Sequence, residues 1–182
     1  MANVVIISGS PSKTTRLKGI VDYAVSTLNE KGFEVEQLDV VDIPAEDLIF
    51  ANFNSEAIQT ANKKVAEADA IVIASPVYKA SFTGVLKTYL DLLPQTGLEN
   101  KIVLPLMLGG TISHLLAIDY SLKPVLSALG AENIIKGVYT VDTCVVRNDN
   151  NEITIAQEAL DRLDYAFNKL ENEIKKKTAQ IS

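Results

Sequence analysis

The sequence predicts an α/β fold: a doubly wound, five-stranded parallel sheet with the strand order 2-1-3-4-5. Five short strand-like runs alternate with five segments of helical periodicity, as is typical of parallel βαβ units. The middle runs are apolar throughout, which is expected of strands covered by helices on both faces. The order 2-1-3-4-5 is chosen because it puts strands one and three side by side at the switch point, where ligands bind in such sheets.

Composition limits the class of protein. The 182 residues suffice for one domain, residues 1–182, and 47% hydrophobic with 22% charged residues is ordinary for a globular protein. The net charge of −6 argues against nucleic acid as a partner. No apolar run reaches the roughly 18 residues of a membrane span. The single Cys144, without an evident metal-ligand set, and the absence of a signal peptide predict a cytoplasmic protein with no metal site.

The first half of the chain alternates between the two patterns. The first strand is residues 3–8, and apolar spacing predicts a helix over about residues 14–30, which ends at Lys31 and Gly32. The second strand is residues 33–40. Residues 42–54 form a long connection whose aromatics, Phe50 and Phe53, are expected to cover a pocket or contact a subunit. Ser55 is the N-cap candidate of a helix that extends to about residue 68.

The second half continues the alternation. Its strands are expected at residues 69–74, 101–108 and 133–141. A helix over about residues 83–93 is stopped by Pro94, and one over about residues 113–129 contains Pro124. A polar stretch, residues 147–152, precedes the last helix, at about residues 154–177.

The loop between the first strand and the first helix, Ser8 to Arg16, has the composition of an anion site. It lies at a helix N-terminus, where backbone N–H groups are unpaired and the helix dipole favours negative charge. Gly9 permits close backbone approach, and Lys13 and Arg16 supply charge. The run lacks carboxylates, and its hydroxyls exceed what one helix cap requires. They come from Ser10, Ser12, Thr14 and Thr15.

The same loop matches neither the Walker A pattern nor the G-x-G-x-x-G dinucleotide fingerprint. A hydroxyl-rich loop after the first strand of an α/β sheet instead indicates the phosphate of flavin mononucleotide (FMN), as in flavodoxin-like folds. Simple helix capping by Ser and Thr is the alternative interpretation.

Two further loops leave the same edge of the predicted sheet. In residues 75–83, Pro76 stiffens the turn and Tyr78 offers an aromatic ring with a polar tip. In residues 109–113, Gly109 and Gly110 permit close approach of the backbone to a flat ring. Either loop alone could be an ordinary turn, but three such loops at one edge indicate a site for a flat heterocycle.

Three motifs together resemble a known family: S-G-S-P, S-P-V-Y-K-A-S-F-T-G-V-L-K-T-Y-L-D-L-L-P and G-G-T-x-x-H-L-L-A-x-D-Y-x-L-K-P-V-L-S-A-L. The chain is similar to the NADPH-dependent FMN reductases of the flavodoxin-like superfamily, most of all to the reductase component of two-component alkanesulfonate monooxygenases. The resemblance implies FMN and NADPH as cofactors. It implies that Ser10, Thr15 and Arg16, with Thr14 beside them, hold the phosphate. The ring would be lined by Pro76, Val77, Tyr78, Lys79, Gly109, Gly110 and Thr111. Ser12 stands where these reductases often have Arg, which bears on phosphate affinity.

The resemblance also implies a π-bulge at Tyr120, in a homo-oligomer (dimer or tetramer) with this residue near an interface. From the residues alone, Pro124 would clash with the carbonyl of Tyr120, and either a π-bulge or a plain proline kink would relieve the clash. The only histidine, His114, could touch a nucleotide phosphate, although capping or packing is the simpler interpretation.

The function that follows is hydride transfer from NADPH to FMN, with reduced FMN passed to a partner monooxygenase. This reaction requires no acidic or basic side chain, so we expect no catalytic residue. Two alternatives stay open: a reductase of quinones or azo compounds that keeps its FMN bound, and a non-enzymatic, flavodoxin-type electron carrier. The absence of Trp disfavours the carrier, whose flavin is commonly held between aromatic rings. The choice between NADPH and NADH is open.

Overall fold

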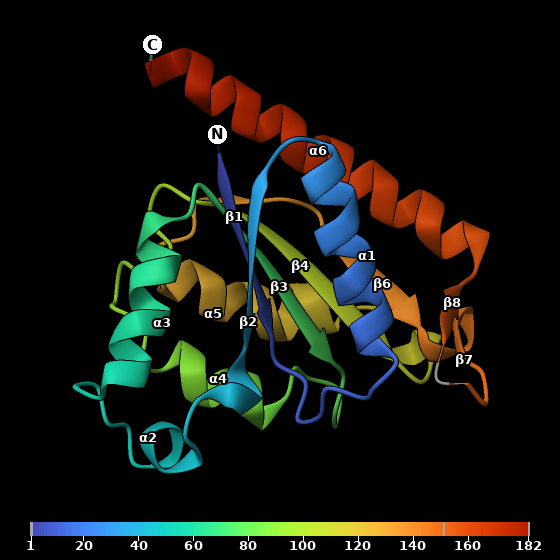
Figure 1. The fold of residues 1–182 in the computed structure, drawn as a ribbon, viewed down its shortest axis with the longest axis horizontal. Helices are drawn as coiled ribbons and strands as arrows, with labels where there is room; N and C mark the ends of the chain where they lie inside the picture. Colours follow the sequence, from blue (N-terminus) through green and yellow to red (C-terminus); the bar gives the residue numbers. More distant parts are fainter. Residues whose placement is uncertain (1, 151, 182) are drawn as a thin grey trace.

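The computed structural model describes residues 2–150 and 152–181, and its centre is a parallel sheet (Figure 1). The strand order is β2-β1-β3-β4-β5, with β6 also paired to β4, and every pairing in this sheet is parallel. The predicted order is therefore confirmed. The strands are β1 (Asn3–Ser8), β2 (Glu34–Asp39), β3 (Ala70–Pro76), β4 (Ile102–Gly109), β5 (Asn133–Ile134) and β6 (Val138–Val141).

The expected strand at residues 133–141 is interrupted, and this corrects the sequence-based assignment. Ile134 pairs with Val103 and Val138 pairs with Leu106, so four steps along this strand face three steps along β4. Pro105 lies opposite the interruption and has no N–H to donate to a ladder. A Cβ at Gly137 would lie 2.6 Å from the Pro105 carbonyl oxygen. The strand thus bulges around a proline in its neighbour.

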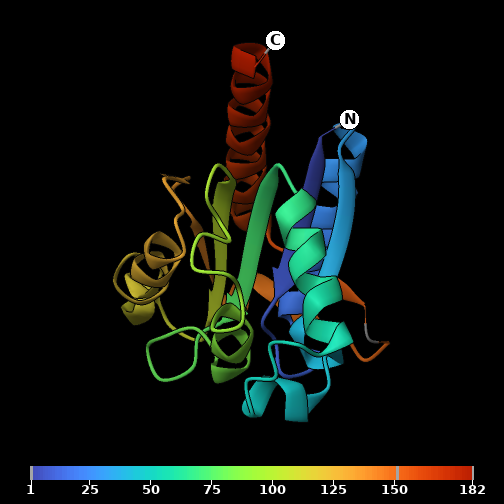
Figure 2. The ribbon, with the colours of Figure 1, turned by 90° about the vertical axis from the view of Figure 1, so that its left-hand side faces the viewer.

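Helices cover both faces of the sheet. Alternate side chains of β1 point to opposite sides, so that Ile6 packs with α1 and α6 and Ile7 packs with α3, α4 and α5. The long α6 extends past the end of the sheet (Figures 1 and 2). The helices are α1 (Leu17–Glu30), α2 (Ala45–Ile49), α3 (Glu56–Glu67), α4 (Gly84–Leu90), α5 (Lys123–Ala128) and α6 (Gln157–Ile181).

Helix starts follow side-chain caps where the sequence offers one. Ser55 accepts from the N–H of Ile58 at 3.1 Å, and Thr83 accepts from the N–H of Leu86 at 3.0 Å. Arg16 offers no such cap, and α1 begins at Leu17 rather than near residue 14. Of the other helices, α4 ends at Leu90, three residues before the expected end, and α6 is shifted from 154–177 to Gln157–Ile181.

The segment before α5 is not the single helix expected over residues 113–129. A 3₁₀ turn, η2 (Ile112–His114), is followed by a π-helical segment, η3 (Ile118–Leu122), and then by α5. The hydroxyl of Ser121 donates to the carbonyl of Ala117 at 2.5 Å. The π-bulge at Tyr120 is confirmed, and it relieves the proline clash that a regular helix would contain.

A β-hairpin near residue 150 was missed. After a 3₁₀ turn, η4 (Asp142–Cys144), strand β7 (Val145–Arg147) pairs antiparallel with β8 (Ile153–Ile155). The turn between them is held by the Asn148 side chain, whose Oδ1 accepts from the N–H groups of Asn150 and Glu152. These short β-branched runs around an Asn and Asp cluster are a hairpin signal.

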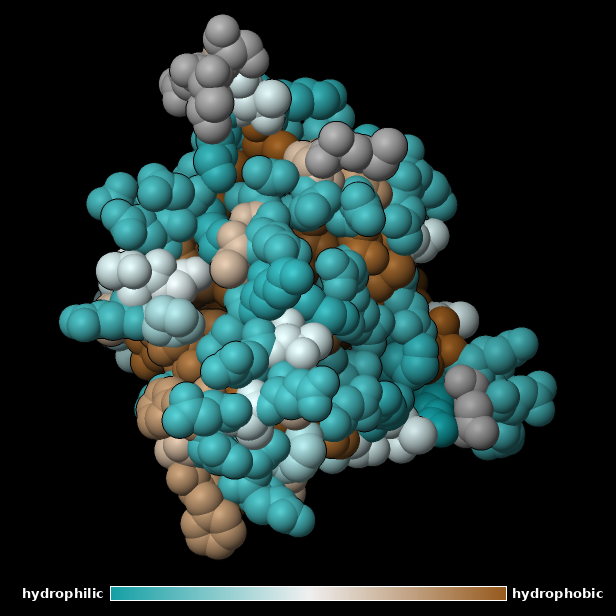
Figure 3. Space-filling view, turned by 60° about the vertical axis from the view of Figure 1, so that its left-hand side comes forward, coloured by the Kyte–Doolittle hydropathy of each residue, from teal (hydrophilic) through white to brown (hydrophobic). Residues whose placement is uncertain are grey.

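The face of the molecule drawn in Figure 3 is largely hydrophilic, with apolar patches between the polar side chains. The 42–54 connection begins at the last residue of η1 (Val40–Asp42) and contains α2, and it exposes Phe50 and Phe53. Across the described part of the chain, no helix combines the length and apolarity needed to cross a bilayer.

Candidate functional site

The loop after β1 is fixed at its start by two neighbouring segments. The N–H of Gly9 donates to the Ala74 carbonyl at 2.8 Å, and the hydroxyl of Thr83 donates to the Gly9 carbonyl at 2.6 Å. A Cβ at Gly9 would lie 2.5 Å from Cβ of Leu86, so only glycine fits against α4 here. The loop therefore leaves the sheet in a position set by β3 and α4.

The loop hydroxyls are paired with one another. Ser10 is buried, its Oγ lies 3.0 Å from the Thr15 hydroxyl, and it donates to the Ser12 carbonyl at 2.7 Å. The Ser12 and Thr14 hydroxyls also lie 3.0 Å apart. These local bonds hold the residues in turns rather than in helix, which explains the late start of α1. Ser10, Ser12 and Thr15 line a small cavity of about 60 Å³ together with residues of α1 and β2.

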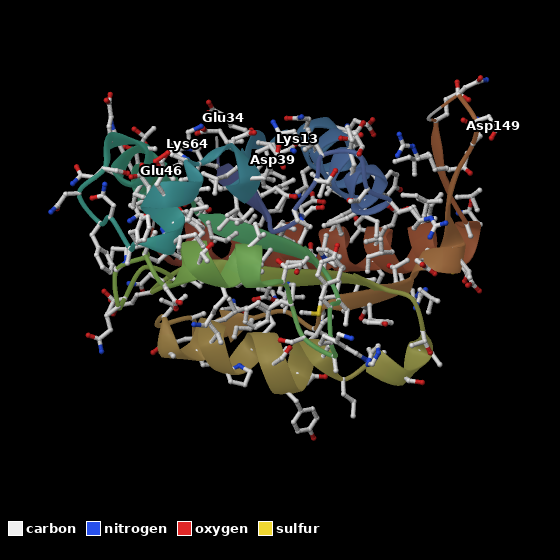
Figure 4. The ribbon with its side chains drawn as sticks, turned by 90° about the horizontal axis from the view of Figure 1, so that it is seen from below. Lys13, Glu34, Asp39, Glu46, Lys64 and Asp149 are labelled. Carbon is white, nitrogen blue, oxygen red and sulfur yellow. The ribbon has the colours of Figure 1, made fainter. Side chains whose placement is uncertain are left out.

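Both cations of the loop are in ion pairs with carboxylates from elsewhere in the chain. Lys13 Nζ lies 2.5 Å from Asp42 and 3.9 Å from Asp39. Figure 4 shows Lys13 and Asp39 next to each other. Arg16 Nη1 lies 3.0 Å from Asp142 Oδ2. The hydrogen bond to Asp42 raises the pKa of Lys13. The loop has no carboxylate of its own, but the fold brings three to it.

A third cation was missed by the sequence analysis. Arg147, on β7, donates from Nη1 to the Thr14 carbonyl at 2.5 Å. Its strand belongs to the hairpin that packs on α1, where a Cβ at Gly19 would lie 2.4 Å from Cγ2 of Ile153. The hairpin is thus seated on α1 and contacts the loop that precedes it.

The loop after β3 forms a tight turn. Tyr78 and Ser81 exchange backbone hydrogen bonds of 2.8 and 3.1 Å. Lys79 and Ala80 have φ of +52° and +63°, the left-handed values of a type I′ turn that usually needs glycine or asparagine. Such strained residues cluster at functional sites. The turn presents the half-exposed ring of Tyr78.

The loop after β4 contains the two glycines in different environments. A Cβ at Gly109 would lie 2.1 Å from the hydroxyl oxygen of Tyr139, so packing against Tyr139 already requires glycine there. Gly110 is exposed, and its nearest contact would be Asp142 Oδ2 at 3.9 Å. The Tyr139 hydroxyl donates to the Thr111 carbonyl at 2.5 Å, and burial raises its pKa. Of the two glycines in this loop, Gly110 is the one whose Cβ position is open to solvent.

The three loops form one connected edge of the sheet. The first joins the second through Thr83 and Gly9, and the second joins the third because the N–H of Val77 donates to the Leu108 carbonyl at 2.8 Å. Asp142 lies beside both the third loop and Arg16 of the first. The expectation that these loops gather is confirmed.

An open cleft of about 770 Å³ lies at this edge. Its lining residues are Val77, Tyr78, Lys79, Ala80 and His114. The cleft is wide and shallow, and its lining comes from the second loop and from His114. The sequence analysis did not count His114 among the site residues. Its place three residues after Thr111, directly after the loop 109–113 that was assigned to the site, was the available signal.

The sequence matches one protein family over most of its length. The family model described as NADPH-dependent FMN reductase matches residues 2–145. The chain belongs to the NADPH-dependent FMN reductase family. FMN and NADPH are the flavin and the nucleotide of this family, and the expected oxidoreductase class is confirmed.

Three similar proteins illustrate the relationship. An FMN reductase (NADPH) of Escherichia coli strain K12 is 46% identical over 143 residues, 79% of this chain and 75% of that protein. One from Pseudomonas putida strain KT2440 is 45% identical over 158 residues, 87% of this chain and 80% of that protein. The crystal structure of the apo form of an NADH:FMN oxidoreductase, EMOB, has a TM-score of 0.84 and 29% identity, and covers 95% of this chain and 90% of that one.

Proposed function

We propose that residues 1–182 form one FMN-binding domain that reduces FMN with NADPH and releases reduced FMN to a flavin-dependent monooxygenase of sulfonate or sulfur assimilation. The observation that carries the proposal is the edge of the sheet at which the three loops are connected. The hydroxyl-rich loop lies there beside α1, and the open cleft lies at the loop after β3. An open cleft allows flavin to enter and leave. The single unpaired Cys144 fits a reducing cytoplasm.

The phosphate of FMN would be held by Ser10, Thr14, Thr15 and Arg16. The buried Ser10 hydroxyl and the Thr15 hydroxyl lie 3.0 Å apart, and both can donate to one anion once Ser10 releases the hydrogen bond that it donates to the Ser12 carbonyl. Arg16 uses only Nη1 for Asp142, and its other N–H groups remain suited to a phosphate. The donor set therefore fits a phosphate monoester.

The flavin ring would lie along Pro76, Val77, Tyr78 and Lys79 and against Gly109, Gly110 and Thr111. The exposed Gly110 gives the backbone room for a flat ring, while the Tyr78 turn presents backbone groups that can meet a heterocycle edge. Bound FMN supplies the hydride acceptor, and NADPH the hydride. The residues of this chain bind, orient and shield the flavin and the nucleotide, and none of them needs to transfer a proton.

We further propose a homodimer or homotetramer with Tyr120 at an interface. The π-helical segment exposes Tyr120, at 79%, and the preceding turn exposes Ile112, Leu115 and Leu116. Four large apolar side chains on adjacent turns form a surface that association would cover. Sedimentation velocity of Tyr120→Ala against the wild type tests this proposal, and an unchanged oligomeric state in the variant contradicts it.

The function is tested by NADPH oxidation under air on dialysed protein, with and without added FMN. We expect turnover that depends on added FMN and saturates with it, and slower turnover with NADH. Turnover without added FMN that a quinone accelerates would identify a reductase with bound flavin. Flavin binding without any turnover would identify an electron carrier.

A further inference from the structure

The cations of the phosphate loop are already neutralised within the protein. Lys13 is hydrogen-bonded to Asp42 and faces Asp39, and Arg16 is paired with Asp142. Two positive charges on the loop therefore face three negative ones, and Arg147 of β7 adds one positive charge beside Thr14. None of the three carboxylates belongs to the loop: Asp39 ends β2, Asp42 ends η1 and Asp142 begins η4.

These ion pairs are poorly suited to a role in folding. About half of the surface of the Lys13, Asp42 and Arg16 side chains is exposed, as is a third of that of Asp142. Exposed pairs of this kind contribute little to stability. They also act on an arriving anion, because each carboxylate repels a phosphate dianion and competes for the cation that would bind it.

We propose that Asp42 and Asp142 set the flavin specificity of the site by lowering its affinity for the phosphate of FMN. The inference rests on the proposed function and refines it. The two carboxylates lower the affinity for FMN relative to a phosphate-free flavin, so that FMN and its reduced form exchange with solution. Asp39, whose Oδ2 lies 3.9 Å from Lys13 Nζ, adds to the repulsion.

The experiment compares Asp42→Asn and Asp142→Asn with the wild type in binding to FMN and to riboflavin, which has the same ring and no phosphate. Asparagine keeps an oxygen that can accept from Lys13 or Arg16, so the geometry is preserved while the charge is removed. Each substitution is expected to lower the Kd for FMN about two- to tenfold at low ionic strength. The Kd for riboflavin is expected to stay unchanged, which also shows that the ring site is intact.

A matched control is Glu173→Gln. Glu173 is paired with Lys176 at 2.8 Å in the C-terminal half of α6, and its substitution makes the same change in net charge away from the loop. It is expected to leave both Kd values unchanged. If it tightens FMN binding as much as Asp142→Asn, net charge rather than these carboxylates is responsible, and the inference fails.

Two outcomes separate this inference from the proposed function. If wild-type protein binds FMN but the Asn variants bind it equally or more weakly, the carboxylates orient the cations or play no part, and only the inference is overturned. If wild-type protein binds neither FMN nor riboflavin, the proposed function falls and the inference falls with it.

Discussion

The hydroxyl of Tyr139 donates a 2.5 Å hydrogen bond to the Thr111 carbonyl and lies where a side chain on Gly109 would have to be. The bond ties β6 to the loop after β4, beside the cleft. Tyr139 is buried in the core, so it cannot swing away to make room. The position of this loop therefore depends on one glycine and one tyrosine that are 30 residues apart in the sequence.

Gly109→Ala is expected to destabilise the protein by about 2 kcal/mol, since the new methyl group overlaps the Tyr139 hydroxyl. Urea unfolding followed by circular dichroism measures the loss. Gly110→Ala is the matched control, and it should change the free energy of unfolding by no more than about 0.5 kcal/mol. Equal losses in the two variants would show that Tyr139 is not the constraint.

Gly19→Ala is expected to destabilise the protein by about 1 kcal/mol, although alanine is the better helix former. The reason is Ile153 of the hairpin, which occupies the space the methyl group needs. In an Ile153→Ala background the same change should cost less, and the double-mutant cycle isolates the contact. At Gly84, where nothing lies within 4 Å, alanine should be neutral or stabilising.

Arg16→Ala is expected to raise the Kd for FMN about tenfold, because a charge-assisted contact to the phosphate is lost. Binding of NADPH should change much less, and so should binding of riboflavin. Fluorescence titration with each ligand checks this. Lys64→Ala, which removes a charge paired with Glu36 on the outside of β2, serves as the control. Equal weakening of FMN and NADPH would count against a phosphate contact.

Glu171 is expected to make stability depend on pH in the acid range. Hydrogen bonds from Lys175 and Lys31 hold its pKa below the ordinary 4.5, and the second of these joins α6 to the end of α1. A carboxylate with a lowered native pKa stabilises the fold above its ordinary pKa, and this contribution is lost as the pH falls through the native value. Glu171→Gln should thus cost about 0.5–1 kcal/mol at pH 7 and nothing at pH 2.

Glu67→Gln is the control for this pH dependence, since Glu67 lies 3.8 Å from Lys63 and both side chains are exposed. Its effect should be near zero at both pH values. A Glu171→Gln effect that stays constant between pH 7 and pH 2 would show that the ion pairs do not carry it.

Local sequence signals predicted much of the fold. The elements that these signals missed depend on contacts between residues that are distant in the sequence. The apolar runs identified the central strands, and Ser55 identified the start of α3, because each of these signals acts within a few residues. The bulge opposite Pro105 depends on a residue in another strand. The hairpin was missed because its strands, at three residues each, are too short for a periodicity argument.

The candidate site shows the same division. The loop hydroxyls, the tight turn and the glycines are contiguous in sequence and could be assigned to one edge. Asp42 lies 29 residues after its partner Lys13, and Asp142 lies 126 residues after its partner Arg16. No pattern in the loop itself predicts these two carboxylates. The charge of the loop was therefore overestimated from its own residues.

The β7–β8 hairpin has a consequence for how the first loop is supported. The family model ends at residue 145, yet Arg147 and Ile153, beyond that point, contact the first loop and the first helix. The support of the first loop therefore includes residues outside the stretch that matches the family model. Substitutions at Arg147 and Ile153 are therefore expected to shift the first loop and the first helix although they lie far from both in the sequence.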